Sequence, residues 1–259
     1  MHSSYFVIDN EEEKQYYWRL ILQCWRLPKH MRHFPASSPV SIEREHYETL
    51  QTDDFLVSLK TDGVRQLLLL TMRPASSTPV SIFVDRTLGM YEVELWASEH
   101  YFVNTSLFDG ELVATRDGVD HFVIFDAIQI SSVVLLDKCY RERMRQINSS
   151  VLSVDVMYAD EQLEQMVSAE DGIVAHHDKT LLLVVKHCMP KQHLDRIWNS
   201  QGGVNHKNDG LIFTRNDATI ETGTASHIFK WKPSHSVDIR IGMREGALLM
   251  WAHQNDCDG

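Results

Sequence analysis

Hydrophobic and polar residues follow a helical period most clearly near the start of the chain. Between Glu11 and Leu27, apolar residues recur at spacings of three and four, at Tyr17, Leu20, Ile21, Cys24 and Trp25. Such residues share one face of a helix, and the acidic residues at positions 11 to 13 suit its positive end. We therefore predict an amphipathic helix over 11–27, ended by Pro28, and an extended link over 35–39.

The next part of the chain has the shorter period of strands. Asp62-Gly63 and Asp117-Gly118 each stand between two apolar runs, which is typical of tight hairpins. The predicted strands are Phe55–Lys60, Val64–Thr71, Val80–Asp85, Met90–Leu95, Glu111–Thr115, Phe122–Ile130, Leu211–Arg215 and His227–Lys232. Helices are expected at 137–148, with its Arg and Lys side chains facing solvent, and at 191–200. Strand groups with irregularly spaced helices indicate an α+β fold of mostly antiparallel sheets.

Composition narrows the class of protein without identifying a function. The 259 residues with a formal net charge of −11 indicate one large domain, or one domain with an appendage. The acidity excludes a generic basic nucleic-acid coat, so any nucleic-acid contact requires a local basic patch. No apolar run approaches the ~20 residues of a membrane helix, and no membrane partner is expected. Glycine-rich nucleotide-binding motifs are absent.

Lys60 is a candidate nucleophile. It ends an apolar strand, a tight turn follows, and Arg65 begins the return strand. Partial loss of hydration at the end of a buried strand favours the neutral amine that a nucleophile must supply. The positive charge of Arg65 is expected to act in the same direction. The alternative is a strand-end lysine that extends into solvent.

Two further groups combine carboxylates with glycine or lysine. Asp109 and Glu111 flank Gly110 and could hold a ribose hydroxyl or a divalent cation; a capped turn is the alternative. Asp209-Gly210 precedes a buried strand, and Lys230 and Lys232 alternate along the last predicted strand, so both face the same side. Lysines near an acid suit a polyphosphate–metal site, and an exposed basic strand face is the alternative.

Five motifs occur in a recognisable order. They are Lys60-Thr61-Asp62-Gly63-Val64-Arg65, Asp109-Gly110-Glu111, Phe125-Asp126, Asp209-Gly210-Leu211-Ile212-Phe213 and Lys230-Trp231-Lys232-Pro233. Together they resemble the covalent nucleotidyltransferases, and most of all the mRNA capping guanylyltransferases. Asp209, where polynucleotide ligases usually have a glutamate, and the Lys-Trp-Lys-Pro strand favour capping enzymes. Asp171-Gly172 resembles the start of the fourth motif, but no Lys-x-Lys strand follows closely, so a turn is expected there.

The resemblance, over about residues 35–238, implies a fold and a domain layout. The implied fold is an α+β nucleotidyltransferase domain, similar to ATP-grasp proteins, with mostly antiparallel sheets flanked by helices and a nucleotide cleft between sheets. The predicted layout is an N-terminal helical segment over 1–34, the nucleotidyltransferase domain over 35–235, and residues 236–259 where an OB-fold would begin. The Arg-x-Asp-Lys motif of that OB-fold is absent, and the 21 residues after Asp238 are too few for its five strands. We therefore expect the nucleotidyltransferase domain without its OB-fold.

The resemblance also implies a two-step reaction and a role for each motif. Lys60 would attack the α-phosphate of GTP, and the lysine-bound GMP would pass to the 5′-diphosphate end of an RNA. Phe125 would stack on the base, Asp209 would be the metal-side carboxylate, and Glu111 would contact the ribose or the metal. The other implied nucleotide contacts are Thr61, Arg65, Arg86, Lys230 and Lys232. The implied cofactor is Mg²⁺ or Mn²⁺.

Partners, location and alternatives follow from the same resemblance. The family implies an RNA triphosphatase and the RNA polymerase II tail as partners, and a nuclear location, or a cytoplasmic one for a viral protein. An ATP-dependent polynucleotide ligase would share Lys60 but prefer ATP. A non-catalytic nucleotide-binding subunit lacking the OB domain is the second alternative. Nucleotide choice separates the transferase from the ligase, and covalent labelling separates both from the subunit.

Overall fold

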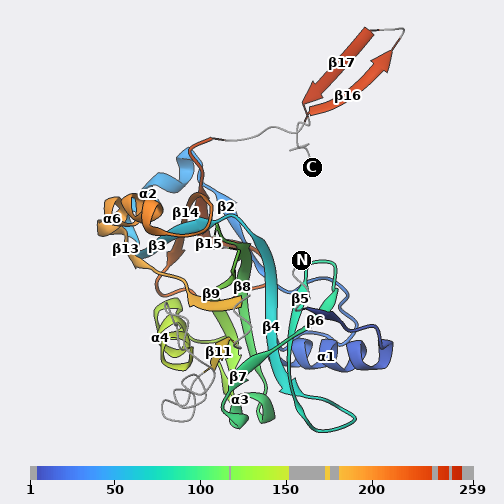
Figure 1. Ribbon diagram of the computed structural model, residues 1–259. Helices are drawn as coiled ribbons and strands as arrows, with labels where there is room; N and C mark the ends of the chain where they lie inside the picture. The colour runs from blue at the N-terminus through green and yellow to red at the C-terminus, as the bar shows by residue number, and fades with distance from the viewer. Residues whose placement is uncertain are drawn as a thin grey trace.

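Two β-sheets, one above the other, form the body of the molecule in the computed structural model (Figure 1). The structure describes residues 5–116, 118–151, 173–175, 181–234, 239–244 and 247–252. Asp117 and Asp171-Gly172, for which turns were predicted, lie outside the described residues.

The lower sheet has eight strands, and most of its pairs are antiparallel. Its path is β1 (Phe6–Val7), β6 (Met90–Val93), β5 (Pro79–Asp85), β4 (Val64–Met72), β8 (Ser106–Ala114), β9 (Asp120–Ile130) and β10 (Val133–Val134). β12 (Leu181–Val185) pairs with β9 in parallel. The first motif spans the connection between β3 (Phe55–Thr61) and β4, which belong to different sheets and do not pair with each other. The hairpin predicted at Asp62-Gly63 is therefore wrong, and this connection links the lower sheet to the upper one.

The upper sheet has five strands drawn from both ends of the described chain. Its order is β13 (Met189–Pro190), β3 (Phe55–Thr61), β14 (Asn208–Arg215), β15 (Gly223–Trp231) and β2 (Ser37–Ser41). β15 and β2 are parallel, and the other pairs are antiparallel. Two smaller pairs are β7 (Leu95–Ala97) with β11 (Ile173–Ala175), and β16 (Ile239–Arg244) with β17 (Ala247–Ala252).

Helices cover both faces of the lower sheet and one face of the upper sheet. The α-helices are α1 (Glu11–Cys24), α2 (Tyr47–Thr52), α3 (Glu99–Val103), α4 (Tyr140–Ser150) and α6 (Leu194–Asn199). Short 3₁₀ turns are η1 (Arg44–His46), η2 (Lys191–His193) and η3 (Ser200–Gly203). In Figure 1, α1 and α4 lie on opposite sides of β4 and β8. No helix in the described ranges is long and apolar enough to cross a membrane.

Alternation along each central strand divides the core into clusters. In β4, Leu67 and Leu69 pack with Tyr17 and Ile21 of α1, whereas Leu68 and Leu70 belong to the cluster on the α4 side. In β3, Phe55, Val57 and Leu59 pack with α6. The intervening residues Ser58 and Lys60 therefore point toward the space between the sheets, where both line a cavity.

The predicted α+β class with mostly antiparallel sheets is confirmed, and several element boundaries differ. Helix α1 ends at Cys24 rather than at residue 27, because Arg26 adopts a left-handed conformation (φ 55°) and Leu27 N donates to Leu22 O. α4 begins at Tyr140, α6 is confined to 194–199, and the strand predicted over 90–95 is split into β6 and β7. The domain boundaries stay predictions; β1 pairs with β6, and α1 packs on the lower sheet.

Two Asp-Gly pairs lie inside strands rather than at turns. A Cβ on Gly110 in β8 would lie 2.5 Å from the ring of Phe122, and one on Gly210 in β14 would lie 1.9 Å from the carbonyl oxygen of Trp231. Glycine is required at both positions because neighbouring strands approach too closely for a side chain. The turn interpretation of residues 109–111 is therefore wrong, and Asp209 lies within its strand rather than before it.

Candidate active site

A cavity of about 170 Å³ opens between the two sheets. The upper sheet contributes Ser37, Pro39, Ser58, Lys60, Thr61, Ile212, Thr214 and Ile228 to its lining. The lower sheet contributes Arg65, Asp109, Glu111, Phe125 and Asp126, joined by Arg86, Tyr140 and Lys186. Most of the predicted nucleotide-binding residues thus converge on one cavity.

Asp209 forms ion pairs with two of the predicted lysines, Lys60 and Lys232. Its Oδ1 lies 2.7 Å from Lys60 Nζ, and its Oδ2 lies 2.5 Å from Lys232 Nζ. Strand pairing brings them together, because Gly210 of β14 lies opposite Lys60 of β3 and Leu211 lies opposite Trp231 of β15. Burial alone would raise the pKa of Asp209, but hydrogen bonds from Lys232 and Lys60 lower it below its usual value. Lys230 lies opposite Ile212.

Arg65 of β4 links the two sheets through its hydrogen bonds to Asp109 and Ser37. Its Nε and Nη2 lie 2.9 and 2.5 Å from the carboxylate oxygens of Asp109, and its Nη1 donates to the carbonyl oxygen of Ser37 at 2.6 Å. Asp109 compensates the charge of Arg65, and the expectation that this charge favours a neutral Lys60 stays a prediction. Burial raises the pKa of Asp109 above its usual value, although the Arg65 guanidinium acts in the opposite direction. The guanidinium also lies 5.2 Å from the ring centroid of Phe125.

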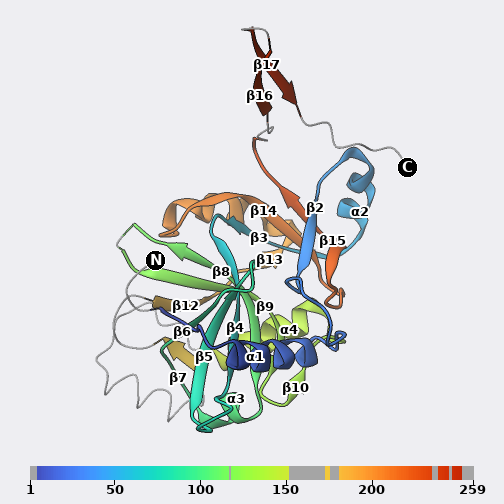
Figure 2. The same cartoon turned by 90° about the vertical axis from the view of Figure 1, so that its right-hand side faces the viewer.

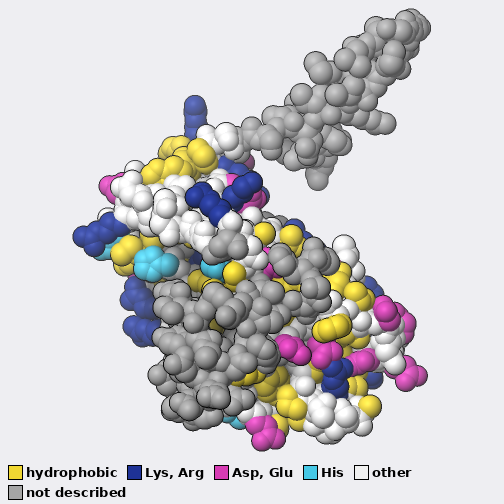
Figure 3. Space-filling view, in the orientation of Figure 1, with side chains coloured by type: hydrophobic (Ala, Val, Ile, Leu, Met, Phe, Trp, Pro, Cys, Tyr) yellow, Lys and Arg dark blue, Asp and Glu magenta, His cyan; other side chains and the backbone are white. Residues whose placement is uncertain are grey.

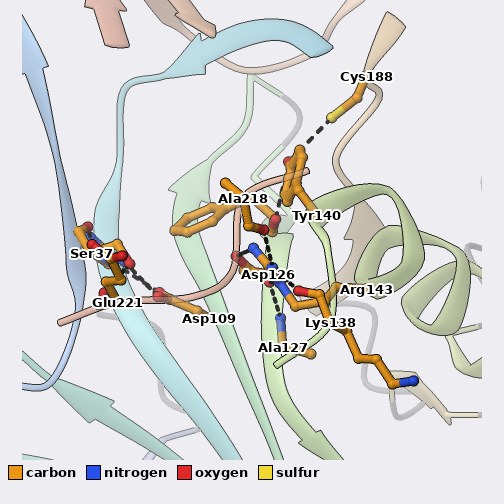
Figure 4. A network of polar contacts seen from close by, with 12 residues as sticks. Ser37, Asp109, Asp126, Ala127, Lys138, Tyr140, Arg143, Cys188, Ala218 and Glu221 are labelled. Atoms are coloured by element: carbon orange, nitrogen blue, oxygen red, sulfur yellow. Dashed lines mark hydrogen bonds and ion pairs between the residues drawn. The ribbon is translucent and has the colours of Figure 1, made fainter. Parts of the chain in front are cut away.

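Asp126, Tyr140 and Arg143 belong to a buried polar network (Figure 4) that contacts the backbone of Phe125. Asp126 forms a two-pronged ion pair with Arg143 of α4, with N–O distances of 2.7 and 2.9 Å. Arg143 also donates to the carbonyl oxygens of Lys138 at 2.7 Å and Ala218 at 2.8 Å. The Tyr140 hydroxyl donates to the carbonyl oxygen of Phe125 at 3.3 Å. Because Ala218 follows β14, this network fixes the Phe125 backbone between both sheets.

The prediction that the Arg and Lys side chains of the helix at 137–148 face solvent is wrong for Arg143. The side chain is about 1% exposed and satisfies its charge with Asp126, so it belongs to the interior of the protein. By contrast, Arg145, two residues later on α4, is exposed.

Lys186, which was not among the predicted site residues, is a buried cation in the cavity. It follows β12, is 9% exposed, and its Nζ donates a hydrogen bond to Thr61 Oγ1. Burial lowers the pKa of Lys186 to about 8, while the nearby Glu111 acts in the opposite direction. Burial likewise raises the pKa of Glu111, opposed by Lys186 and Lys60. The available signal was a lysine directly after a buried apolar run, the same signal that singled out Lys60.

Arg86 lies at the rim of the cavity on an ordered loop. The carboxylate of Asp85 accepts hydrogen bonds from the backbone N–H groups of Thr87 at 2.8 Å and Gly89 at 2.9 Å. Burial alone would raise the pKa of Asp85, but the hydrogen bonds that its carboxylate accepts lower the pKa below its usual value. The loop therefore holds Arg86 exposed beside the cavity.

The carboxylates suit a metal ion that arrives with a nucleotide better than a resident metal site. Among the described residues, no three His, Cys, Asp or Glu side chains gather around one point. Mg²⁺ is commonly held by one or two carboxylates together with substrate phosphates. Asp209 and Glu111, both near Lys60, provide oxygen donors of that kind.

Comparisons with known proteins agree with the motif order. Residues 6–234 match the family model described as mRNA capping enzyme, catalytic domain. An mRNA-capping enzyme subunit alpha from Schizosaccharomyces pombe is 26% identical over 219 residues, which cover 77% of this chain and 50% of that protein. The subunit alpha from Neurospora crassa is 27% identical over 240 residues, covering 87% of this chain and 57% of that protein.

The similarity to solved structures is weaker. An ATP-dependent DNA ligase from bacteriophage T7, in complex with ATP, has a TM-score of 0.48 and 13% identity, covering 80% of this chain and 71% of that chain. The chain spans about half the length of the curated relatives it matches.

Proposed function

The chain belongs to the family of mRNA capping enzyme catalytic domains, which are nucleotidyltransferases, and from this premise we propose that it is an mRNA guanylyltransferase. It transfers GMP from GTP, through a lysine-bound intermediate, to the 5′-diphosphate end of an RNA. The observation that carries the proposal is the position of Lys60. Its amine lies at the cavity between the sheets, paired with Asp209, which also holds Lys232.

In the first step, Lys60 Nζ attacks the α-phosphorus of GTP. A nitrogen–phosphorus bond forms, the phosphorus–oxygen bond to pyrophosphate breaks, and Nζ loses its protons to the surroundings. Lys232, held on the same carboxylate, keeps a positive charge beside the reacting phosphate, where negative charge develops. In the second step, a terminal oxygen of the RNA diphosphate attacks the same phosphorus, the nitrogen–phosphorus bond breaks, and Lys60 is released.

The remaining side chains bind and orient the nucleotide. Phe125 stacks on the base, and its support by Tyr140 and the Asp126–Arg143 pair keeps the ring in place. Arg65 and Glu111 lie opposite each other on β4 and β8 and contact the ribose. Asp209 and Glu111 would hold Mg²⁺ or Mn²⁺, which, when bound, would neutralise phosphate charge. The nuclear location, the triphosphatase and the polymerase tail stay predictions.

Covalent labelling tests the proposal. The protein is incubated with α-³²P GTP or ATP and Mg²⁺ or Mn²⁺, denatured, and examined for label on a 29.9 kDa band. We expect label from GTP that is lost in Lys60→Ala and in Lys60→Arg, and kept in Lys14→Ala, which changes a partly exposed lysine ion-paired with Glu11 on α1.

The other outcomes contradict the proposal in different ways. Label from ATP alone would favour the ligase alternative. GTP binding by calorimetry without any label would favour the non-catalytic subunit.

A further inference from the structure

A second cavity, of about 420 Å³, adjoins the candidate active site at Arg86. Part of its wall is formed by Met31, His33 and Phe34, in the segment that connects α1 to β2. Arg86 lines both cavities, so a ligand that passes this side chain can extend from one cavity into the other. In Figure 2 the connecting segment rises from α1, beside the lower sheet, to β2 in the upper one.

The connecting segment is strongly cationic in an acidic chain. Residues 26–36 contain Arg26, Lys29 and Arg32 and no Asp or Glu, whereas the whole chain has a net charge of −11. Lys29, His30, Arg32 and His33 are all exposed. On the face drawn in Figure 3, acidic side chains gather on the side of α1, and Lys and Arg side chains lie around the upper sheet. Charge is therefore unevenly distributed over this face.

Most of this positive charge is not compensated by acids. Arg26 pairs with Asp137 at 2.8 Å. The Arg32 guanidinium donates only to backbone carbonyls, at 3.1 and 3.2 Å, and among the described residues neither it nor Lys29 has a carboxylate partner. Two acids lie next to wall residues in sequence: Glu221, adjacent to Thr222, and Asp85, adjacent to Arg86, whose carboxylate accepts hydrogen bonds from Thr87 and Gly89 within its own loop. The segment therefore carries net positive charge at exposed positions beside the second cavity, whose wall includes Met31, His33 and Phe34 of the same segment.

The segment is also held in a defined position. Trp18 Nε1 donates to the carbonyl oxygen of Met31 at 2.9 Å, and Gly223 N donates to the carbonyl oxygen of Ala36 at 2.8 Å. Met31 and Phe34 pack against the core cluster that contains α1. A surface that is ordered before binding loses less entropy when it takes up a ligand.

We propose that Lys29–Phe34 together with Arg86, called here the basic ridge, binds the single-stranded RNA whose 5′ end enters the candidate active site. The ridge has what such binding requires: cations for backbone phosphates, and a partly exposed aromatic ring, Phe34, for a base. Continuity with the first cavity through Arg86 favours the acceptor RNA over an acidic protein segment. This inference rests on the proposed guanylyltransfer, which requires an RNA substrate.

Binding of a labelled 12-nucleotide, 5′-diphosphate RNA, followed by fluorescence anisotropy, tests the ridge. The test variant is Lys29→Glu/Arg32→Glu. The matched control is Arg19→Glu/Arg145→Glu, which makes the same charge change at exposed positions of α1 and α4. We expect about tenfold or greater weakening in the ridge variant and less than about twofold in the control. The magnitude of the slope of log K against log salt should fall by about 1.4 in the ridge variant alone, since each of the two cations lost contributes about 0.7 on a single strand.

Further measurements separate this inference from the proposed function. GTP labelling of Lys60 should be equal in the two double variants. If neither protein is labelled but RNA binding is still weakened in the ridge variant alone, the basic ridge is supported as an RNA-binding surface and the proposed guanylyltransfer is wrong. Phe34→Leu, which keeps an apolar side chain, should weaken RNA binding without changing the salt slope. Equal loss in both double variants, or no loss in either, would overturn the ridge. Tighter binding of a phosphorylated acidic peptide of equal charge would assign the surface to a protein partner instead.

Discussion

The amine of Lys60 and the carboxylate of Asp209 form an ion pair, 2.7 Å from Nζ to Oδ1, where β3 and β14 lie side by side. The two side chains are 20% and 27% exposed, and partly solvated pairs of this kind contribute little to stability. The same carboxylate binds Lys232, so one acid holds two cations beside the cavity between the sheets. The pair therefore positions charge rather than stabilising the fold.

Asp209→Asn should reduce GTP labelling of Lys60 by at least about 10²-fold, because the two lysines lose their shared counter-charge and defined position. The thermal midpoint should change by no more than a few degrees. Asp217→Asn, at an exposed acid paired with Arg215, is the control and should leave labelling unchanged. Full labelling by the Asp209 variant would show that this carboxylate has no role in the first step.

Gly210→Ala should destabilise the protein by about 3 kcal/mol or more and abolish labelling. Its Cβ would lie 1.9 Å from the carbonyl oxygen of Trp231, so β14 and β15 would have to separate. Gly202→Ala is the matched control, since a Cβ there meets nothing within 4 Å, and it should cost less than about 1 kcal/mol. Urea unfolding measures both, and equal midpoints would contradict the close approach of the two strands.

Arg143→Met should destabilise the protein by about 3–5 kcal/mol, because Asp126 would be left as a buried charge without its partner. Arg145→Met, on the same helix but exposed, should change stability by less than about 0.5 kcal/mol. The double variant Asp126→Leu/Arg143→Met should recover part of the loss. Equal urea midpoints for Arg143→Met and the parent would contradict the prediction that Asp126 depends on this buried ion pair.

Lys186 should make stability depend on pH in the alkaline range. Burial lowers its pKa from 10.5 to about 8, so between these values the unfolded chain binds more protons than the folded protein. Stability of the parent should therefore rise with pH, relative to Lys186→Met, by at most roughly 3 kcal/mol across this window. Lys138→Met, at a half-exposed lysine, should keep the parental slope. Parallel curves for the parent and Lys186→Met would contradict the burial of a titrating amine.

Local sequence patterns identified many of the residues that line the cavity. They did not identify the long-range contacts that hold those residues in place. Lys60, Arg65, Glu111 and Phe125 lie in short motifs beside clear strands, so their convergence could be predicted. Lys186 offered the same local signal as Lys60, a lysine directly after an apolar run, but its place in the cavity depends on the parallel pairing of β12 with β9, which no local pattern encodes. The Asp-Gly pairs were ambiguous, since the same dipeptide suits a turn or a strand pressed against its neighbour.

Arg143 is a second residue whose burial could not be predicted from local sequence. A helix rich in charged residues predicts a solvated face, and only the partner on β9 shows which arginine is buried. Asp126, 17 positions earlier, is part of a motif but carries no sequence signal that it pairs with α4. Long-range partners of this kind decide which of several similar side chains becomes structural.

The parallel pairing of β2 with β15, Ser37 opposite Gly223, has a consequence for synthesis of the protein on the ribosome. The nascent chain carries Lys60 long before β14 and β15 emerge, and the strands that surround this lysine cannot assemble until both are released. Because such distant pairings form slowly, the upper sheet closes late. The growing polypeptide therefore lacks the assembled cavity around Lys60 until Trp231 and Lys232 have left the exit tunnel.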